Sequence, residues 1–246
     1  MEEERLDKLL IQRKLVSTRV RAEKVIRETG VLVNGKLVTK TGKRFRVDSD
    51  IKMITEDIPW LSKRAFKLTG ALSAWDLEIK SATLIDTEAR LGAFTEVLIK
   101  EEAKKVYAIN SKTNQLDSNL ESNIGVVNIE NTHLRELTPS IINEKCDGCT
   151  IDVSSNSLEN IFPFLQGFIR DNGFVIALIK PQCEVAKKEL GKGGVLKDKK
   201  LYRSVIEDVK KYAKLNNLQY VDHIESPILN ENGNREFLML LSRAVR

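Results

Sequence analysis

The strongest constraint on the fold is a series of short apolar runs without polar alternation, which recur between residues 83 and 179 with helical stretches among them. Strands of this kind are buried on both faces, and helices that alternate with them cover a parallel sheet. We therefore predict an α/β fold with a mostly parallel sheet. Strands are expected at Thr83–Ile85, Val106–Ile109, Val126–Ile129, Thr150–Val153 and Phe174–Ile179, and helices at Ala93–Glu102, Leu158–Arg170 and Leu201–Leu215.

Two further strands close the sheet. Tyr220–Ile224 and Glu236–Leu241 are apolar runs on either side of the Asn-Glu-Asn-Gly turn at Asn230–Gly233. A turn of this composition favours antiparallel pairing of its neighbours. The expected sheet has seven strands, with the last one antiparallel, in a domain that spans residues 82–246.

The N-terminal segment has a different organisation. Leu6, Leu9 and Leu10 predict one short helix, and a second helix follows Ser17 as N-cap and ends at Gly30. Val31–Val38 contains Asn-Gly between two short β-rich runs, which is a strong hairpin signature. A strand near Ile51–Ile54 would complete a small sheet. We predict an α+β domain over residues 1–58, and a linker with a first helix over 59–81.

Charge is concentrated in that small domain. The whole chain of 246 residues carries +5, and residues 1–58 hold 14 Lys or Arg against 10 Asp or Glu. No apolar run reaches the roughly 18 residues of a membrane span, and the acidic start resembles no targeting peptide. Three cysteines do not describe a disulfide framework. These features favour a cytoplasmic protein with no membrane partner.

Ligands of open α/β sheets bind outside the carboxyl ends of the strands. The residues at these ends are polar, which makes this edge the place to look for chemistry. The turn after the first strand, between Leu84 and Glu96, has the position of a phosphate or cofactor loop but contains only one glycine, Gly92. The strand-end residues are Asp86, Asn110, Glu130, Asp152 and Lys180.

The N-terminal domain resembles the RNA-binding module of ribosomal S-four type, also called the alpha-L motif. The resemblance rests on Arg5–Asp7, Ser17–Ala22 and Val33–Gly35. Clustered cations on a small module are what phosphate contacts require, although a charged face can also serve only to keep a small domain soluble. The resemblance implies RNA contacts from Arg19, Arg21, Lys24, Lys43, Arg44 and Arg46, to which we add Lys63 and Arg64 of the linker.

Motifs along the rest of the chain resemble the TlyA, or hemolysin-A-like, family of RNA 2′-O-methyltransferases, which joins such a module to an FtsJ-like domain. That resemblance implies a Rossmann-like class I methyltransferase fold, the cofactor S-adenosylmethionine, and ribosomal RNA or a ribosomal subunit as partner. The motifs are Pro59–Ser62, Phe66–Leu68, Arg135–Pro139, Ile179–Gln182, Gly191–Gly194 and Glu236–Leu238.

The family has a Lys-Asp-Lys-Glu tetrad around the target ribose hydroxyl, and the matching residues are Lys67, Asp152, Lys180 and Glu236. A 2′-hydroxyl is a poor nucleophile, so a desolvated lysine near other cations can act as base or stabilise the developing alkoxide. The resemblance makes Lys180 the central group and Lys67 its partner. The alternative is a buried ion-pair network inherited from a catalytic ancestor.

The cofactor side departs from the family. Glu88 stands where relatives have the first glycine of the turn, and its carboxylate would repel the carboxylate of S-adenosylmethionine unless a cation such as Arg90 offsets it. Asn110 replaces the acidic residue that binds the ribose, and an aromatic after Asp152-Val153-Ser154 is lost. The cofactor contacts implied by the resemblance are Asp86, Glu88, Gly92, Phe94 and Asn110.

Two functions follow from this asymmetry. The first is 2′-O-ribose methylation of ribosomal RNA with S-adenosylmethionine. The second is a catalytically impaired, RNA-binding pseudo-methyltransferase that acts on ribosomal RNA or ribosome assembly, with cofactor binding weakened or lost. Cys146 and Cys149 form a Cys-x-x-Cys with no second pair or spaced histidine, so we expect no metal. No apolar span or membrane-seeking helix supports haemolysis.

Overall fold

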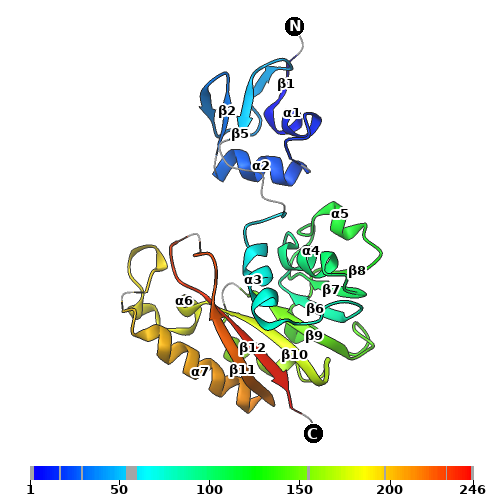
Figure 1. Cartoon of the computed structure of the whole chain (residues 1–246), viewed down its shortest axis with the longest axis vertical. Helices are drawn as coiled ribbons and strands as arrows, with labels where there is room; N and C mark the ends of the chain where they lie inside the picture. The colour runs from blue at the N-terminus through cyan, green and yellow to red at the C-terminus, as the bar shows by residue number, and fades with distance from the viewer. Residues whose placement is uncertain are drawn as a thin grey trace. The chain divides into compact units, whose positions relative to one another are not determined.

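The chain divides into two compact units, Met1–Ser62 and Lys63–Arg246. The computed structural model describes residues 3–16, 18–28, 30–53, 60–153, 156–196, 198–230 and 232–244 (Figure 1). The segment 59–81, predicted as a linker with a first helix, spans the division between the units, and its helix α3 (Ala65–Trp75) belongs to the second unit. The predicted boundaries after residues 58 and 81 stay predictions.

The first unit is an α+β module. Strand β2 lies at the centre of a three-stranded sheet, and β1 pairs with β4 in a second small sheet that the sequence did not predict. The apolar sides of both helices pack in one core with Val31, Val33 and Ile51. The elements are β1 (Glu3–Arg5), α1 (Leu6–Gln12), α2 (Arg19–Glu28), β2 (Val31–Val33), β3 (Lys36–Val38), β4 (Arg44–Arg46) and β5 (Ile51–Met53).

The predicted turns of this unit are confirmed where the structure describes them. Asn34 and Gly35 have φ of 51° and 75°, the left-handed pair that a two-residue hairpin needs. Gly30 follows α2 with φ of 78°, and a Cβ there would lie 2.4 Å from Leu37 Cδ1. The predicted N-cap Ser17 lies outside the described residues.

The second unit is built on a seven-stranded sheet in the order β11-β12-β10-β9-β6-β7-β8. All its pairs are parallel except those of β12, which is antiparallel to β10 and β11. The predicted sheet is therefore confirmed. The strands are β6 (Thr83–Thr87), β7 (Lys105–Ile109), β8 (Val126–Ile129), β9 (Cys146–Ile151), β10 (Ile169–Ile179), β11 (Leu218–Glu225) and β12 (Phe237–Arg243).

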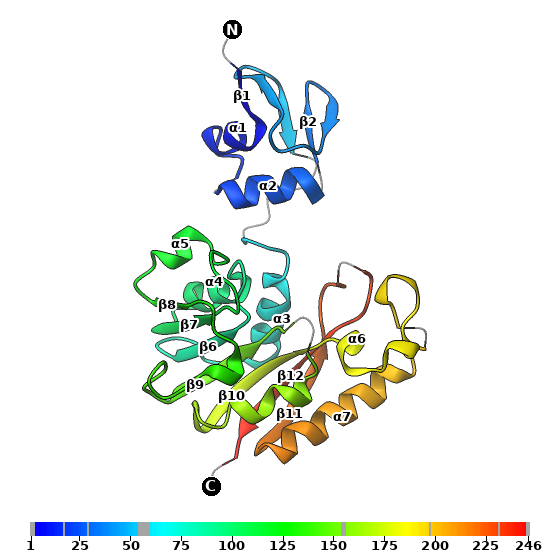
Figure 2. The same ribbon diagram turned by 180° about the vertical axis from the view of Figure 1, so that it is seen from behind.

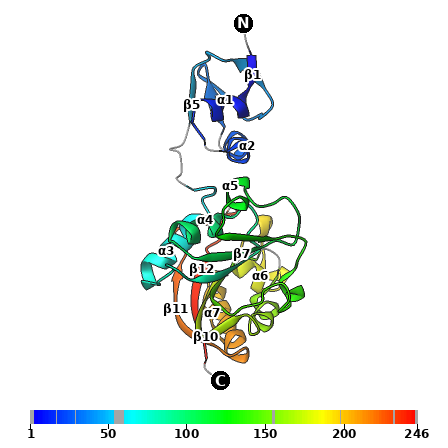
Figure 3. The same ribbon diagram turned by 90° about the vertical axis from the view of Figure 1, so that its right-hand side faces the viewer.

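Helices cover both faces of this sheet (Figure 3). On one face, Val205 and Val209 of α7 pack in a cluster with Val175 of β10 and Met239 of β12. The alternate residues of β10, such as Ile176, are equally buried on the other face. Because helices cover both faces of the sheet, its strands are apolar along their whole length. The remaining helices are α4 (Ala93–Lys100), α5 (Ser118–Glu121), α6 (Pro181–Glu184) and α7 (Leu201–Leu215), with 3-10 turns at Leu134–Glu136, Leu158–Asn160, Phe162–Phe164, Lys187–Glu189 and Lys192–Gly194.

The helix predicted over Leu158–Arg170 is wrong. The segment forms two 3-10 turns, Leu158–Asn160 and Phe162–Phe164, and its last two residues begin β10. Pro163 lies inside the second turn, where it lacks the N–H that an α-helix would need. The apolar spacing that mimics a helix instead reflects burial of Leu158, Phe162 and Leu165 under α7 and the sheet. No helix among the described residues could cross a membrane.

Candidate active site

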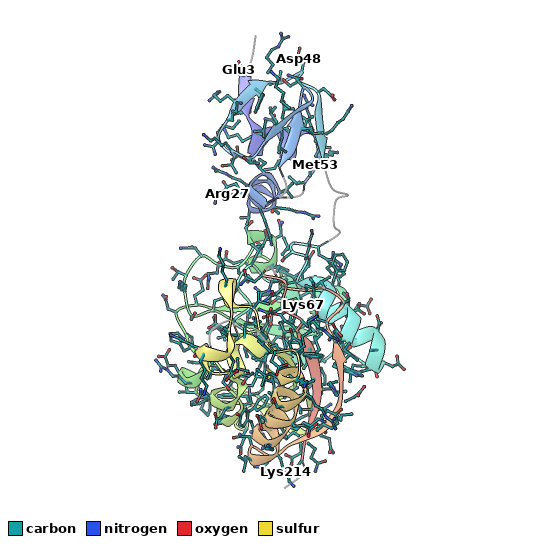
Figure 4. The ribbon with its side chains drawn as sticks, turned by 90° about the vertical axis from the view of Figure 1, so that its left-hand side faces the viewer. Glu3, Arg27, Asp48, Met53, Lys67 and Lys214 are labelled. Atoms are coloured by element: carbon teal, nitrogen blue, oxygen red, sulfur yellow. The ribbon has the colours of Figure 1, made fainter. Side chains whose placement is uncertain are left out.

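The polar residues that follow the parallel strands gather at one edge of the second unit. β6, β7, β9 and β10 run parallel, so their carboxyl ends lie together. β12 is antiparallel and therefore begins at that edge, directly after Glu236. The first turn of α3 contributes Lys67 (Figure 4). Four separate elements thus meet at one place.

Lys180 and Asp152 form a buried ion pair. Lys180 Nζ lies 2.5 Å from Asp152 Oδ1 and donates a hydrogen bond of 2.7 Å to the carbonyl oxygen of Val153. Lys180 follows the last residue of β10 and precedes Pro181, whose fixed φ opens α6. The lysine side chain is therefore directed along the strand edge rather than along a helix, and its ammonium is held at two points.

Lys67 and Glu236 form the second buried pair, through Lys67 Nζ and Glu236 Oε2. Only 4% of Lys67 and 1% of Glu236 is exposed. The other carboxylate oxygen of Glu236 accepts a 3.4 Å hydrogen bond from Gln182 Nε2, two residues after Lys180. This contact connects the two ion pairs. The structure thus brings together all four residues that the sequence assigned to the tetrad.

Asp152 is the electrostatic centre of this group. Burial alone would raise the pKa of Asp152, but the charges of Lys180, Arg64 and Lys67 outweigh it, and the net effect lowers that pKa. Arg64, whose side chain is 25% exposed, pairs with the second oxygen of Asp152. The sequence placed Arg64 among the RNA contacts and did not foresee this pair.

The turn after β6 has an unusual backbone. Glu88, Arg90 and Gly92 have φ of 53°, 55° and 95°, so three alternate residues are left-handed. A non-glycine residue in this conformation costs about 1 kcal/mol. A side chain at Gly92 would be strained by its φ of 95°, and its Cβ would lie 2.3 Å from Leu120 Cδ1, so that leucine would have to shift. The turn thus keeps a glycine-loop backbone although two of the three positions carry side chains, and it leads directly into α4.

Asp86 is held inside the protein by hydroxyl groups. Thr95 Oγ1 and Thr150 Oγ1 donate hydrogen bonds of 2.7 and 2.8 Å to its two carboxylate oxygens. Only 1% of the residue is exposed. Burial raises the pKa of Asp86 to about 6, and the two hydroxyl hydrogen bonds offset only part of this effect. Asp86 ties β6 to α4 and β9 rather than displaying a carboxylate.

Asn110 holds the same turn from β7. Its Oδ1 accepts a hydrogen bond of 2.5 Å from the backbone N–H of Arg90, and its Nδ2 donates a longer one of 3.5 Å to the Arg90 carbonyl. The exposed fraction of Asn110 is 0%. An aspartate could not donate the second bond. The residue predicted to bind a ribose is thus engaged with the turn.

The side chains of the predicted cofactor site are mostly turned inward. Phe94 is buried like Asp86 and Asn110, and Gly92 is packed against Leu120. Glu88 is half-buried and accepts a 3.3 Å hydrogen bond from Ser111 Oγ. The backbone of the turn and the first turn of α4 have the form that a nucleotide-like cofactor needs. The backbone of this site is therefore suited to S-adenosylmethionine, whereas most of the predicted side chains are already engaged within the protein.

The predicted RNA contacts of the first unit differ in exposure. Lys43, Arg44 and Arg46 are exposed on and before β4, where Arg46 also pairs with Asp48. Arg19 is exposed on α2 and lies 3.4 Å from the buried carboxylate of Asp7. These residues present positive charge to solvent, as phosphate binding would require.

Two residues of α2 do not follow that pattern. Arg21 is only 7% exposed, which differs from the exposed position that a phosphate contact requires. It lies one helical turn before Val25, which packs against the core of this unit. Lys24 is half-buried and donates a 3.1 Å hydrogen bond to Ser62 Oγ, whereas Lys63 is exposed. A role of each in RNA binding stays a prediction.

The Cys-x-x-Cys lies within β9, where successive side chains alternate between faces. Cys146 and Cys149 are three residues apart and so point to opposite faces. Burial raises the pKa of the Cys146 thiol to about 12 and that of Cys149 well above its usual value. Among the residues that the structure describes, no group of three or more His, Cys, Asp or Glu could hold a metal ion.

Sequence reasoning missed Arg64, Thr95 and Thr150 as members of the site. Thr150 precedes Asp152 by two residues on β9, and Thr95 is one turn into α4. A threonine in a strand or a helix carries no signal of its own. Asp86 lies on β6 and Thr150 on the neighbouring strand β9, so only the pairing of these strands shows that the Thr150 hydroxyl reaches Asp86. The Thr95 hydroxyl reaches it from α4.

Comparison with known proteins agrees with this architecture. Residues 60–243 match the model of the FtsJ-like methyltransferases, and residues 4–51 match that of the S4 domain. The 16S/23S rRNA (cytidine-2′-O)-methyltransferase TlyA of Mycobacterium tuberculosis is 31% identical over 96% of this chain and 89% of its own. Hemolysin A of Brachyspira hyodysenteriae is 28% identical over 95% and 98%.

A solved structure shows the same arrangement. The structure titled "Putative hemolysin from Streptococcus thermophilus" has a TM-score of 0.76 and 31% identity, and covers 99% of this chain and 90% of its own. Two matched domains in the same order, together with relatives aligned over nearly the full length, determine the family. The chain belongs to the TlyA and hemolysin A family, which joins an S4 domain to an FtsJ-like methyltransferase domain.

Proposed function

We propose that this protein methylates a ribose 2′-hydroxyl of ribosomal RNA, in the cytoplasm, with S-adenosylmethionine as methyl donor. The observation that carries the proposal is the convergence of the Lys180–Asp152 and Lys67–Glu236 ion pairs at the carboxyl edge of the sheet. The names of the relatives support ribosomal RNA as substrate. The S4 module supports RNA binding.

The chain's own residues account for activation of the hydroxyl. Asp152 and the carbonyl oxygen of Val153 hold the amine of Lys180, and Glu236 holds that of Lys67. The hydroxyl proton passes to the amine of Lys180 when that amine is uncharged, and the ammonium group of Lys67 stabilises the negative charge that grows on the ribose oxygen. We assign the central role to Lys180, because the Val153 carbonyl fixes its position in addition to the carboxylate.

Bound S-adenosylmethionine would supply an electrophilic methyl group. The peptide groups between Glu88 and Gly92, together with the first turn of α4, would hold it, because their backbone has the required left-handed turns. Burial of the tetrad excludes water from the reacting oxygen, which strengthens each charge interaction there.

The test is methyl transfer from isotopically labelled S-adenosylmethionine to ribosomal RNA, with the modified nucleoside identified by mass spectrometry. We expect Lys180→Ala to lower the rate by at least about a thousandfold, as removal of a central charge-stabilising group does. RNA affinity is expected to change little. Lys187→Ala is the matched control, because Lys187 is an exposed lysine shortly after α6. Transfer by Lys180→Ala at the wild-type rate would refute the assigned role.

A second function is favoured by the inward direction of Asp86, Phe94 and Asn110. If these side chains do not open toward a ligand, the protein binds RNA without transferring a methyl group and acts in ribosome assembly. Calorimetry with S-adenosylmethionine separates the two functions. Micromolar binding contradicts the second, and absence of binding in the presence of ribosomal RNA contradicts the first.

A further inference from the structure

A groove of about 490 Å³ lies between the start of α7 and the strands β11 and β12. Its lining combines cations with aromatic rings. Because α7 begins beside α6 and β12 begins after Glu236, the groove opens at the same end of the sheet as the tetrad (Figure 2). The lining residues that the argument uses are Lys199, Lys200, Tyr202, Arg203, Arg235 and Phe237.

Three of the cations are available for a ligand. Lys199, Lys200 and Arg203 are exposed, and none of them lies within ion-pair distance of another residue that the structure describes, although Glu207 attracts Arg203 electrostatically. The acids near them are already engaged. Glu207 pairs with Lys210 at 2.9 Å, and Asp198 accepts a 2.8 Å hydrogen bond from the backbone N–H of Lys200. The groove therefore presents unbalanced positive charge, which suits phosphate groups.

The fourth cation, Arg235, is fixed as a flat surface. Its guanidinium carbon lies 5.6 Å from the ring centre of Tyr202 and 5.9 Å from that of Phe237. Glu225 binds its edge through both carboxylate oxygens, with Nε to Oε1 at 2.6 Å. The residue remains exposed. An exposed guanidinium that lies near two rings and is fixed along its edge by a carboxylate is suited to stacking of an unpaired base.

The groove and the tetrad are adjacent along the chain. Arg235 and Phe237 are the immediate neighbours of Glu236, so a ligand on the guanidinium is one residue along the chain from the Lys67–Glu236 pair. A single-stranded RNA whose target ribose lies at the tetrad would reach the groove with an adjacent nucleotide. An acidic peptide would match the cations but would leave the stacking surface unused.

We propose that this groove binds a nucleotide that flanks the methylated one in single-stranded RNA. Its base stacks on Arg235, and its phosphates contact Lys199, Lys200 and Arg203. The proposal rests on the proposed function in that the ligand is the RNA substrate. It assigns to the methyltransferase unit a part of RNA recognition that the S4 domain does not supply.

The first experiment measures binding of a fluorescein-labelled single-stranded oligoribonucleotide to the full-length protein without S-adenosylmethionine, by anisotropy at several salt concentrations. Arg203→Glu is expected to weaken binding roughly tenfold at moderate salt and to reduce the slope of log K against log salt by about 1. The matched control is Lys214→Glu, on the same helix about 16 Å farther along its axis. Figure 4 shows Lys214 at the far end of the unit from Lys67.

The second experiment tests the stacked base. Arg235→Lys keeps the positive charge but removes the flat guanidinium. Wild-type protein is expected to quench 2-aminopurine placed in the oligoribonucleotide, and Arg235→Lys is expected to lose that quenching. Circular dichroism and thermal unfolding confirm that each variant is folded. Equal quenching by both proteins, or equal binding of a double-stranded RNA of the same length, contradicts the stacking role.

The outcome does not depend on methyl transfer. If Arg203→Glu weakens RNA binding while wild-type protein transfers no methyl group, the groove is supported and the proposed activity fails. If wild-type protein methylates RNA, and Arg203→Glu and Lys214→Glu bind RNA equally well, the groove is refuted and the activity stands.

Discussion

The tetrad side and the cofactor side of the strand edge carry buried carboxylates in opposite ways. Asp152 is surrounded by Lys180, Arg64 and Lys67, which keep its pKa lowered in spite of burial. Asp86 accepts hydrogen bonds from two hydroxyls and from the backbone of Thr95 but is not paired with a cation among the described residues, and burial raises its pKa to about 6. The negative charge of Asp152 adds to the difficulty of ionising Asp86. The comparison teaches that the carboxylate is balanced by cations where chemistry is proposed, whereas at the turn its charge is met only by hydrogen-bond donors, so that its pKa rises.

The same contrast holds for the side chains around each carboxylate. On the tetrad side, Lys67 and Lys180 meet carboxylates from separate elements, and their amines converge. On the cofactor side, Asn110 binds the backbone of its own neighbouring turn. Side chains of the first kind are the ones that we propose to act on a ligand, whereas those of the second kind maintain a backbone shape.

Loss of one tetrad partner should have the largest effect. Lys67→Met leaves Glu236 buried without its cation, and we expect it to lower the free energy of unfolding by about 3–5 kcal/mol. Lys67→Met combined with Glu236→Gln should recover more than half of that loss, because no unpaired charge remains. Chemical denaturation of the three proteins measures both effects. A loss below about 1 kcal/mol in the single variant would show that the pair is hydrated, contrary to its burial.

Replacement of Asp86 by Asn should have a smaller effect with a defined pH dependence. The native state keeps the Asp86 proton up to about pH 6, whereas the ordinary pKa of an aspartate is 3.8. The folded protein binds more protons between these values, so this residue destabilises it as pH rises. Asp86→Asn should therefore be more stable than wild type at pH 7, by up to about 3 kcal/mol, and equal to it below about pH 4.

Thermal unfolding between pH 4 and pH 7 checks this prediction. Asn preserves the geometry of Asp86, since the hydroxyls of Thr95 and Thr150 can accept hydrogen bonds as well as donate them. Glu101→Gln, which removes an exposed negative charge, is the control. If Asp86→Asn is destabilised equally at every pH, Asp86 is needed as an anion and the contrast with Asp152 disappears.

Glu88→Gly should have the smallest effect on stability. The left-handed φ of 53° favours glycine, but glycine also loses more entropy on folding, so we expect a change within about 1 kcal/mol. Removal of the carboxylate should raise affinity for S-adenosylmethionine roughly tenfold in calorimetry, by relief of charge repulsion. Glu88→Gln is the matched control, because it removes the charge but keeps a side chain at the left-handed position. A gain in Glu88→Gly that is absent from Glu88→Gln would assign the effect to the backbone rather than to charge.

Most of the fold could be predicted from local patterns. The unbroken apolar runs gave the strands of the sheet, and Asn34-Gly35 gave the hairpin, because each pattern reports the burial or φ angle of its own residues. The prediction of a helix over Leu158–Arg170 was wrong because an apolar pattern reports which residues are buried and not which secondary structure they form. Its apolar spacing reported burial correctly, but Pro163 determined that the segment could not be helical.

The candidate site could be predicted only in part. Family motifs identified Lys67, Asp152, Lys180 and Glu236, although residue types alone could not say which lysine pairs with which acid. The ribose contact of Asn110 stays a prediction, and its hydrogen bond with the backbone of Arg90 could not be foreseen, because the two are neighbours only when β7 lies beside β6. The Arg64–Asp152 pair joins residues that are 88 positions apart.

The sequence by itself determined the two-unit organisation, the family and the positions of the strands along the chain, since periodicity and motif register are properties of neighbouring residues. Tertiary structure alone decided whether a polar residue at the strand edge faces a ligand or its own protein. The physical reason is that burial of a polar group without a hydrogen bond costs free energy. Its partner is therefore whichever donor or acceptor the fold brings within hydrogen-bond distance.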